Sequence, residues 1–200
     1  MLPRADWLVQ NGPSPAVLDA PSANRSGHVS PTTAEHVASD FGNRIDLVLG
    51  GGAASLGIES TVIGFENGGA VMLRPGAVTR EQIEPLIGPL GYPAPLRVSS
   101  PGQLASHYAP RTPLRLNARE LEQDEALLAF GGDKPPAAHR SKNLSPSGDL
   151  KEAAANLFAM LRELDRAGAR RIAVMPIPDH GLGEAINDRL RRAAAPRDAG

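Results

Sequence analysis

The sequence predicts an α/β protein in three parts: a portion of a mixed sheet, a linker rich in proline and glycine, and a small parallel-sheet domain. A turn signal, Glu66-Asn67-Gly68-Gly69, joins two apolar stretches and indicates an antiparallel hairpin. Residues 88–113 hold six prolines and three glycines, a composition that disfavours regular structure. Beyond them strand and helix patterns alternate, which is typical of a parallel α/β domain.

Composition and charge narrow the class of protein. The 200 residues are 41% hydrophobic, enough for a core, and their formal net charge is −1. This charge and an aromatic content of 4% argue against a basic or base-stacking surface and leave only weak RNA binding. The chain has no cysteine, and no apolar run approaches the roughly 20 residues of a membrane span. Because a signal-peptide pattern is also absent, we expect a cytoplasmic protein without membrane contact.

The most informative stretch of the first part is a polar loop, residues 20–33, followed by a predicted helix. The loop carries small hydroxyl and amide side chains, namely Ser22, Asn24, Ser26, Ser30 and Thr32. The pattern allows two interpretations of where this helix starts. Pro31 suits the first helical position with Ser30 as N-cap. Thr32 and Glu35 instead fit a capping box that starts two residues later.

In both interpretations the N-terminus of the helix points into a loop of hydroxyl groups. Such a terminus, with its unpaired N–H groups, attracts anions such as phosphate. An ordinary capped helix after a loop explains the same pattern without a ligand. All three lysines lie beyond residue 130, so arginine and backbone N–H groups would hold an anion in the first part.

Between this loop and the linker, the patterns predict two helices, three strands and a glycine-rich loop. The helices run from Ala34 to Phe41, before Gly42, and from a Thr79–Gln82 capping box to about Ile87, before Gly88. The strands run from Ile45 to Leu49, from Ser60 to Phe65 and from Ala70 to Arg74. The loop, Gly50 to Gly57, lacks the lysine of a P-loop, which favours a flexible connection over a phosphate cradle.

The third part is predicted to hold three strands and two helices. The strands are Leu114 to Leu116, Ala126 to Phe130 and Arg171 to Ile177, and the helices are Asp149 to Ala167 and Leu182 to Ala194. The last strand is a continuous apolar run, as in a buried parallel sheet. Gly181-Leu182-Gly183, before the last helix, indicates a plain turn in preference to an anion site.

Residues 89–113 form the predicted linker, and two adjacent residues in it stand out. His107 and Tyr108 place an imidazole beside a phenol within Ser-Pro-Gly-Gln-Leu-Ala-Ser-His-Tyr-Ala-Pro, residues 100–110. Composition leaves two interpretations open, a ring packed on a domain surface and a functional pair. A connection roughly twice the ordinary length is typical of functional or interdomain segments.

The residue inventory favours binding an anion over nucleophilic catalysis. Gly-x-Ser-x-Gly and His-Glu-x-x-His are both absent, so we expect neither a hydrolase elbow nor a metal held by the protein alone. Hydroxyls, an amide, arginines and helix N-termini suit phosphoryl or nucleotidyl transfer, where positioning and charge stabilisation supply most of the catalysis. Any Mg²⁺ would arrive with the nucleotide, held by its phosphates.

Five ordered motifs give the chain a resemblance to a known family. They are Ala20-Pro-Ser-Ala-Asn-x-Ser-Gly, Ser30-Pro-Thr-Thr, Gly57-Ile-Glu-Ser-Thr-Val, Leu73-Arg-Pro-Gly and Ser106-His-Tyr-Ala-Pro. In this order they resemble the YrdC family, and more closely its long two-domain form, the L-threonylcarbamoyladenylate synthases. Two stretches that begin at Ser147 and Gly181 resemble the C-terminal domain of that form, so the resemblance covers residues 20–196.

The resemblance implies a fold and a reaction. Residues 1–88 would form the C-terminal part of a YrdC-like twisted mixed sheet, residues 89–113 a linker or lid, and residues 114–200 a Rossmann-like α/β domain. The enzyme would be a nucleotidyltransferase that converts L-threonine, bicarbonate and ATP into threonylcarbamoyl-AMP and pyrophosphate. The threonine amine would capture bicarbonate, and the carbamate would attack the α-phosphate. The product would pass to the machinery that makes threonylcarbamoyladenosine in tRNA.

The resemblance also implies roles for individual residues. ATP would be bound by Ser22, Ser30, Arg74 and Tyr108. L-threonine would be contacted by Ala20 and Ser60. Asn24, Thr61 and His107 would support the site. No side chain is implied as a general base.

The chain departs from the family upstream of residue 20. In the family the catalytic domain begins well before this point, and the upstream part carries a lysine- and arginine-containing motif for the ATP phosphates. Residues 1–19 contain no lysine and do not resemble the family. We therefore expect a truncated copy, the second half of a catalytic domain joined to an intact C-terminal domain. The alternative function is an inactive remnant that binds nucleotide or RNA.

Overall fold

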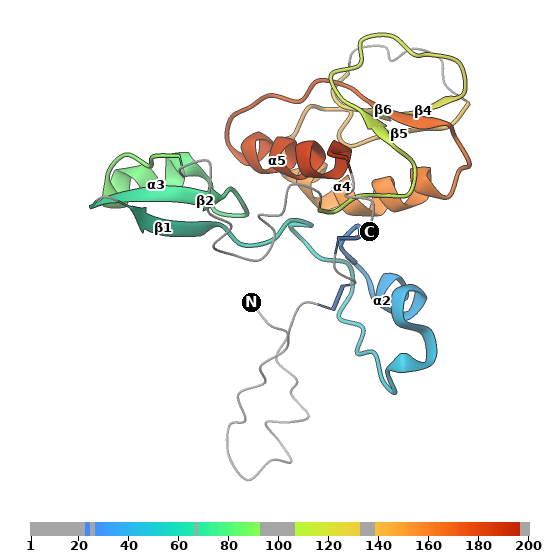
Figure 1. Cartoon of the computed structure of the whole chain (residues 1–200), viewed down its shortest axis with the longest axis horizontal. Helices are drawn as coiled ribbons and strands as arrows, with labels where there is room; N and C mark the ends of the chain where they lie inside the picture. Colours follow the sequence, from blue (N-terminus) through green and yellow to red (C-terminus); the bar gives the residue numbers. More distant parts are fainter. Residues whose placement is uncertain (1–22, 25–26, 67, 93–106, 133–138, 197–200) are drawn as a thin grey trace.

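The computed structural model describes residues 23–24, 27–66, 68–92, 107–132 and 139–196. These residues form two sheets, an antiparallel hairpin near the middle of the chain and a four-stranded parallel sheet in its last part (Figure 1). The predicted mixture of one antiparallel and one parallel component is thereby confirmed. No helix in the described ranges is long and apolar enough to cross a membrane.

The parallel sheet and its helices follow the predicted alternation. The elements are β3 (Leu114–Arg115), β4 (Glu125–Ala129), β5 (Ser141–Asn143), α4 (Leu150–Asp165), β6 (Arg171–Val174) and α5 (Leu182–Ala194). The strands lie in the order β3-β6-β4-β5 and are all parallel. β5 was not predicted, because Ser-Lys-Asn has no apolar pattern. β6 ends at Val174, short of the predicted Ile177, since Pro176 has no N–H group for a ladder.

Both helices pack on one face of this sheet. Ala126 and Leu128 of β4 face α4 and α5, while Leu127 and Ala129, the alternate residues, belong to a smaller cluster on the other face. That second face is covered by Ala118 and other residues of the connection between β3 and β4. The two connections that leave β3 and β6 therefore run over opposite faces.

The hairpin consists of β1 (Val62–Glu66) and β2 (Gly69–Arg74), and α3 (Arg80–Ile87) packs on it. The predicted capping box forms, with the backbone N–H of Thr79 donating to Gln82 Oε1 at 2.9 Å. Met72, Ile83 and Leu90 make a small separate core.

The helix α3 also contacts the C-terminal domain. Arg80 Nη2 lies 3.1 Å from Glu184 Oε1 on α5. The N–H of Gly181 donates to Glu81 Oε1 at 2.9 Å, so a carboxylate of this chain lies at the N-terminus of α5. The predicted plain turn at residues 181–183 thus holds an anionic side chain.

The helix α2 (Ala34–Phe41) has the predicted range and ends at Gly42, followed by a short 3₁₀ turn (Gly42–Arg44), but neither Ser30 nor Thr32 is its N-cap. Its N-cap is Thr33, whose hydroxyl accepts the N–H of His36 at 3.3 Å. Ser30 and Thr32 therefore lie before the helix, in the extended approach to it.

The predicted strand from Ile45 to Leu49 is wrong. The segment lies outside any strand, and the side chains of Leu47 and Leu49 are 74% and 80% exposed. A strand requires a neighbour for its backbone hydrogen bonds, and within the described ranges the hairpin strands pair with each other and with Gly91. The apolar pattern of this segment thus has no sheet to join there.

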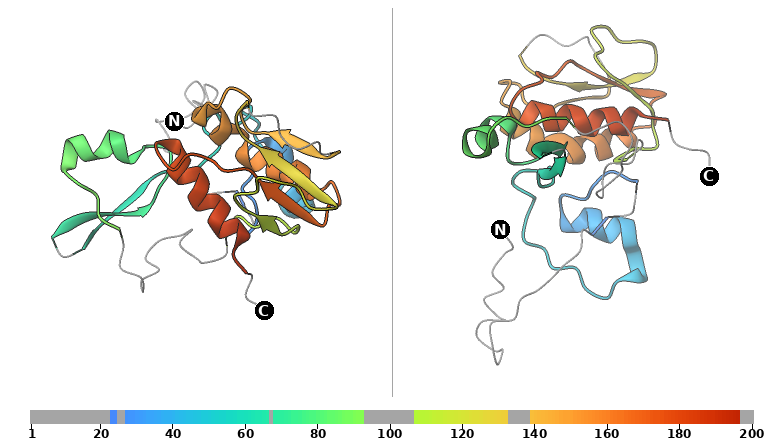
Figure 2. Two further views of the ribbon diagram at one scale, coloured as in Figure 1. Left: turned by 90° about the horizontal axis from the view of Figure 1, so that it is seen from above. Right: turned by 60° about the vertical axis from the view of Figure 1, so that its left-hand side comes forward.

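The segment that carries α2 packs against the C-terminal domain. Figure 1 and the right-hand view of Figure 2 place α2 on the side of α4 away from the parallel sheet. Val29 and Ile58 are buried in the same core as α4 and α5. Gly57 lies directly against α4: a Cβ atom there would be 2.3 Å from the carbonyl oxygen of Ala154.

We expect Gly57→Ala to lower the free energy of unfolding by about 1–3 kcal/mol more than Gly52→Ala, because it would push the loop off α4. Both glycines have positive φ values, 64° and 89°, so both variants share the backbone strain. An added methyl group would meet other atoms within 4 Å at Gly57 and none at Gly52, which makes Gly52 a matched control. Urea unfolding of the two variants gives the comparison, and equal losses would contradict the close approach.

Candidate functional site

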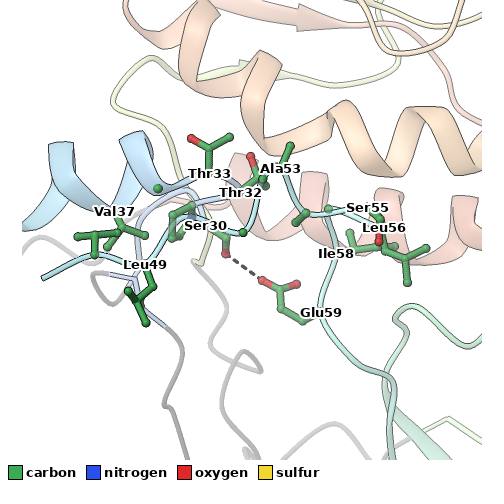
Figure 3. A pocket seen from close by; sticks show the side chains of 18 residues that line it. Ser30, Thr32, Thr33, Val37, Leu49, Ala53, Ser55, Leu56, Ile58 and Glu59 are labelled. Atoms are coloured by element: carbon green, nitrogen blue, oxygen red, sulfur yellow. Dashed lines mark hydrogen bonds between the residues drawn. The ribbon is translucent and has the colours of Figure 1, made fainter. Parts of the chain in front are cut away.

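A hollow of about 760 Å³ opens between the approach to α2 and the glycine-rich loop (Figure 3). We call it the N-terminal hollow. Ser30, Thr32 and Thr33 line it from the first segment, and Ser55 and Glu59 from the second. The N–H of Ala54 donates to the carbonyl of Thr32 at 2.9 Å, which holds the two segments together. The glycine-rich loop, predicted as a connection, thus forms part of the wall at the predicted anion site.

The first turn of α2 is fixed by His36. Burial lowers the pKa of this histidine, and the positive charges of Arg162 and Arg166 lower it further. The neutral imidazole that results accepts the backbone N–H of Thr32 through Nδ1 at 3.2 Å. The polar groups at the start of α2 are therefore held in place beside the hollow.

One carboxylate joins the hollow to the C-terminal domain. Ser30 Oγ donates to Glu59 Oε1 at 2.8 Å, and the other oxygen of Glu59 accepts from Arg189 Nε at 2.9 Å. The side chain of Arg189, on α5, is completely buried, and its Nη1 also donates to Asp188 at 2.6 Å. A serine predicted to bind ATP is thus connected through Glu59 to a buried arginine.

A second arginine of the C-terminal domain holds the segment that leads from Ser30 into α2. Arg162, on α4, donates to both carboxylate oxygens of Asp40 on α2, at 2.9 Å for the Nη1–Oδ1 contact. The same guanidinium donates to the carbonyls of Val29 and Ser30. Its hydrogen bonds are the main cause that lowers the pKa of Asp40. The backbone of Ser30 and the position of α2 are therefore set by α4.

The structure brings Arg74 and Ser60 together. Arg74, at the end of β2, donates to the carbonyl of Ser60 from Nε at 3.2 Å and from Nη2 at 3.0 Å, and to Ser60 Oγ at 3.3 Å. Gly76 packs on the same backbone, where a Cβ atom would lie 2.4 Å from the carbonyl carbon of Ser60. Because Ser60 follows Glu59 in the chain, Ser30, Ser60 and Arg74 gather around residues 59–60.

Thr61 uses its hydroxyl for backbone contacts. Its Oγ1 donates to the carbonyl of Val78 at 2.5 Å and accepts the N–H of the same residue at 3.1 Å. These bonds fasten the start of β1 to the turn before α3. Thr61 thus supports Ser60 from the side of the hairpin.

The His107–Tyr108 pair lies on the C-terminal domain. Tyr108 is 1% exposed, its ring is stacked on Phe158 of α4 at 5.4 Å, and the guanidinium of Arg189 lies 5.1 Å from the ring centroid. Its φ of 60° is unusual for a bulky residue and marks local strain. Burial raises the pKa of Tyr108 and lowers that of His107. The packed interpretation of the linker ring is therefore the one observed.

The structure does not test the predicted contacts of the other site residues. Ala20 and Ser22 lie outside the described residues, so their contacts stay predictions. Asn24 lies within them, and its role also stays a prediction. Glu59, Arg162 and Arg189 were missed by the sequence reasoning. Glu59 stands inside a quoted motif, and the two arginines lie on helices for which only the ranges were predicted.

The described residues contain no group of three or more histidine, aspartate or glutamate side chains placed to hold a metal ion. The donors that line the N-terminal hollow are hydroxyls, backbone groups and the Glu59 carboxylate. This donor set is suited to hydrogen bonding with a polar ligand more than to a metal site that the protein completes by itself.

The fold and site together define a two-part α/β protein in which helices of a parallel-sheet domain support a hollow lined by both apolar and hydroxyl-bearing side chains. A family model described as "Threonylcarbamoyl-AMP synthase, C-terminal domain" matches residues 78–195, more than half of the chain. The chain belongs to this family. A second model, for Sua5, YciO and YrdC proteins and described as "Telomere recombination", matches residues 3–76. Its match begins at residue 3, so the expectation that residues 1–19 do not resemble the family is wrong; the quoted motifs, which begin at residue 20, did not reach this stretch.

Individual relatives agree with this membership. The threonylcarbamoyl-AMP synthases of Bacillus subtilis and Pyrococcus abyssi are each 37% identical to this chain over 90% of its length. The chain spans 58% of the length of both relatives. The crystal structure of P. abyssi Sua5 complexed with L-threonine superposes with a TM-score of 0.76 at 32% identity, covering 88% of this chain and 57% of that one. A variant of P. abyssi Sua5 with a histidine and the next tyrosine replaced by alanine gives 0.72 at 30% identity, covering 87% and 56%.

We expect Tyr108→Ala to lower the free energy of unfolding by about 3–5 kcal/mol, because it removes a ring from the core of the C-terminal domain. Tyr92, which is 77% exposed, provides the control: Tyr92→Ala should change stability by less than about 1 kcal/mol. Chemical denaturation of both variants measures the difference. Similar losses in the two would show that the Tyr108 ring does not contribute to the core.

We expect Asp40→Asn to lower stability by about 2 kcal/mol at neutral pH, because it weakens the pair with Arg162. The pKa of Asp40 is lower in the folded protein than in the unfolded chain, so its contribution is present above about pH 4 and is lost as the pH falls through the folded pKa. The stability difference between wild type and variant should therefore shrink in acid. Asp46→Asn, at an exposed position, is the control, and a difference that stayed constant down to about pH 2 would refute the role of the Asp40 carboxylate.

Proposed function

We propose that this chain takes part in the synthesis of threonylcarbamoyl-AMP from L-threonine, bicarbonate and ATP. The observation that supports this most directly is the gathering of Ser30, Ser60 and Arg74 around Glu59 at the edge of the N-terminal hollow. Two relatives named threonylcarbamoyl-AMP synthase, each 37% identical, support the same activity. The product would serve threonylcarbamoyladenosine formation in cytoplasmic tRNA, after transfer to further modifying proteins.

The ATP phosphates are assigned to the N-terminal hollow. The α2 N-terminus favours negative charge, and the hydroxyls of Ser30 and Thr32 lie on its approach. Ser22 and Arg74 complete the proposed ATP contacts. Mg²⁺ accompanies the nucleotide and is held by its phosphates. In this arrangement Ser30 must exchange its hydrogen bond to Glu59 for one to the nucleotide.

L-threonine is assigned to the side of Ser60 and the backbone of Ala20. A P. abyssi relative has been crystallised with L-threonine, which supports this substrate class. The amine of threonine attacks bicarbonate with loss of water, and the resulting carbamate oxygen attacks the α-phosphate of ATP and releases pyrophosphate. Arg74 stabilises the charge that develops on phosphate.

We propose that His107 and Tyr108 act on the site by supporting Arg189. His107 and Tyr108 are adjacent in this sequence. A P. abyssi Sua5 variant in which a histidine and the next tyrosine are replaced by alanine supports a functional role for such a pair. Under this proposal Tyr108 influences the nucleotide through Arg189 and Glu59. The division into residues 1–88, 89–113 and 114–200 is kept as part of the proposal, with the middle part as a lid.

Pyrophosphate release tests the function. Purified chain is supplied with ATP, Mg²⁺, bicarbonate and L-threonine, and a parallel reaction omits threonine. Threonine-dependent release supports the proposed synthesis by this chain. No release from protein that remains folded contradicts it and favours the alternative, a module that binds nucleotide or RNA without chemistry.

We expect Arg74→Ala to reduce threonine-dependent pyrophosphate release by about 100-fold or more, because a charged donor near the phosphate is lost. Arg119→Ala provides the control, since Arg119 is exposed on the connection between β3 and β4, on the far face of the parallel sheet. Unchanged kinetics for Arg74→Ala in folded protein would exclude Arg74 from the site.

A further inference from the structure

A second hollow, of about 230 Å³, lies at the carboxyl ends of β3 and β6. We call it the C-terminal hollow. Asn117 follows β3, Asp179 lies in the connection after β6, and Asn187 and Arg191 project from α5. It shares no lining residue with the N-terminal hollow, and neither the family nor the proposed function assigns it a role.

The position of this hollow follows from the topology of the sheet. β3 and β6 are neighbours, yet the chain leaves β3 over the face covered by Ala118 and leaves β6 toward α5 on the opposite face. Parallel strands whose connections diverge in this way leave a crevice at their carboxyl ends, and ligands of open α/β sheets bind in such crevices.

The backbone at the hollow is held in an uncommon conformation. Asn117 has a φ of 56°, in the left-handed region that asparagine adopts more readily than most residues other than glycine. The N–H of the next residue, Ala118, donates to the carbonyl of Val174 at 2.8 Å and fixes this turn across the end of β6. Strained residues that are fixed by their surroundings concentrate at binding sites.

The polar groups of the hollow are also fixed before any ligand arrives. Asn187 Nδ2 donates to the carbonyl of Ile177 at 3.0 Å and to Asp179 Oδ1 at 3.2 Å, which holds the connection against α5. Arg191 lies one helical turn beyond Asn187, on the same side of α5. Within the part of the chain that the structure describes, Asp179 and Arg191 pair neither with each other nor with another charge.

The chemistry of the lining selects a class of ligand. Leu116, Met175 and Leu190 give the lining an apolar part, which we call the floor, and the exposed residues Asp179 and Arg191 add one carboxylate and one guanidinium. A nucleotide phosphate would meet the repulsion of Asp179, whereas a zwitterion satisfies both charges at once. We propose that the C-terminal hollow binds an L-α-amino acid with an apolar side chain. Its ammonium pairs with Asp179, its carboxylate with Arg191, and its side chain lies on the floor.

Methyl NMR of the full chain tests this proposal, with ¹³C-methyl methionine as the label and L-leucine as the probe. Met175 lines the hollow, while Met72 lies in the hairpin core and Met160 on α4. We expect the Met175 signal to shift saturably at millimolar L-leucine, with the signals of Met72 and Met160 unchanged. Leucinamide, which lacks the carboxylate, and N-acetyl-L-leucine, which lacks the ammonium, should bind at least tenfold more weakly.

Two variants assign the contacts. Asp179→Asn and Arg191→Gln should each weaken L-leucine binding at least tenfold, and both positions are exposed, so the fold is retained. Arg170→Gln is the matched control, because Arg170 precedes β6 at the opposite edge of the sheet. A Met175 signal that does not respond to L-leucine, binding of either analogue as tight as that of L-leucine, or equal weakening by the control overturns the proposal. These outcomes are independent of pyrophosphate release, because the hollow shares no residue with the proposed catalytic site.

Discussion

The N-terminal hollow depends on the ion pair between Glu59 and Arg189. The arginine side chain is completely buried, so its charge requires the carboxylate. Removal of Glu59 alone would leave that charge with Asp188 as its remaining partner among the described ion pairs, and breaking a buried pair in this way typically costs about 3–5 kcal/mol. The same carboxylate accepts the hydroxyl of Ser30. The Glu59 carboxylate therefore both stabilises the fold and positions Ser30, a residue proposed to bind ATP.

The walls of the N-terminal hollow come from Ala23 and residues 30–59, but their support comes from the last part of the chain. Arg162 holds the carbonyls before α2, Arg189 holds Glu59, and Gly57 lies on the backbone of α4. Each contact joins residues about a hundred or more positions apart in sequence, so local folding of the first part does not produce the hollow. The C-terminal domain thus acts as the template on which the proposed substrate site is assembled.

Local patterns predicted the hairpin, the capping box of α3 and the full extent of α5, because turn residues and helix caps act over a few positions. They failed at Ile45 to Leu49, where the pattern is that of a strand but the partner strand is not among the described elements. They also failed to select Arg162 and Arg189, although both lie in line with buried apolar residues: Arg162 follows Phe158 by four positions, and Arg189 follows Ala185 by four. Only tertiary contacts show that these two are paired across the two parts of the chain. The motifs identified the neighbourhood of Ser30 and Ser60, and the contact between Arg74 and Ser60 needed the fold.

The 13-residue helix α5 has contacts of different kinds along its length. Its N-terminus receives Glu81 from α3, its middle carries Arg189, and Asn187 and Arg191 face the C-terminal hollow. Residues 187 and 191 lie on one side of the helix, and residue 189 lies on roughly the other, since each residue turns about 100°. The C-terminal hollow therefore borders one side of α5, and the N-terminal hollow is connected to the other side through Glu59 and Arg189. Thermodynamic linkage makes any coupling through α5 reciprocal. If a ligand in one hollow changes the affinity of the other hollow by some factor, a ligand in that other hollow changes the affinity of the first hollow by the same factor.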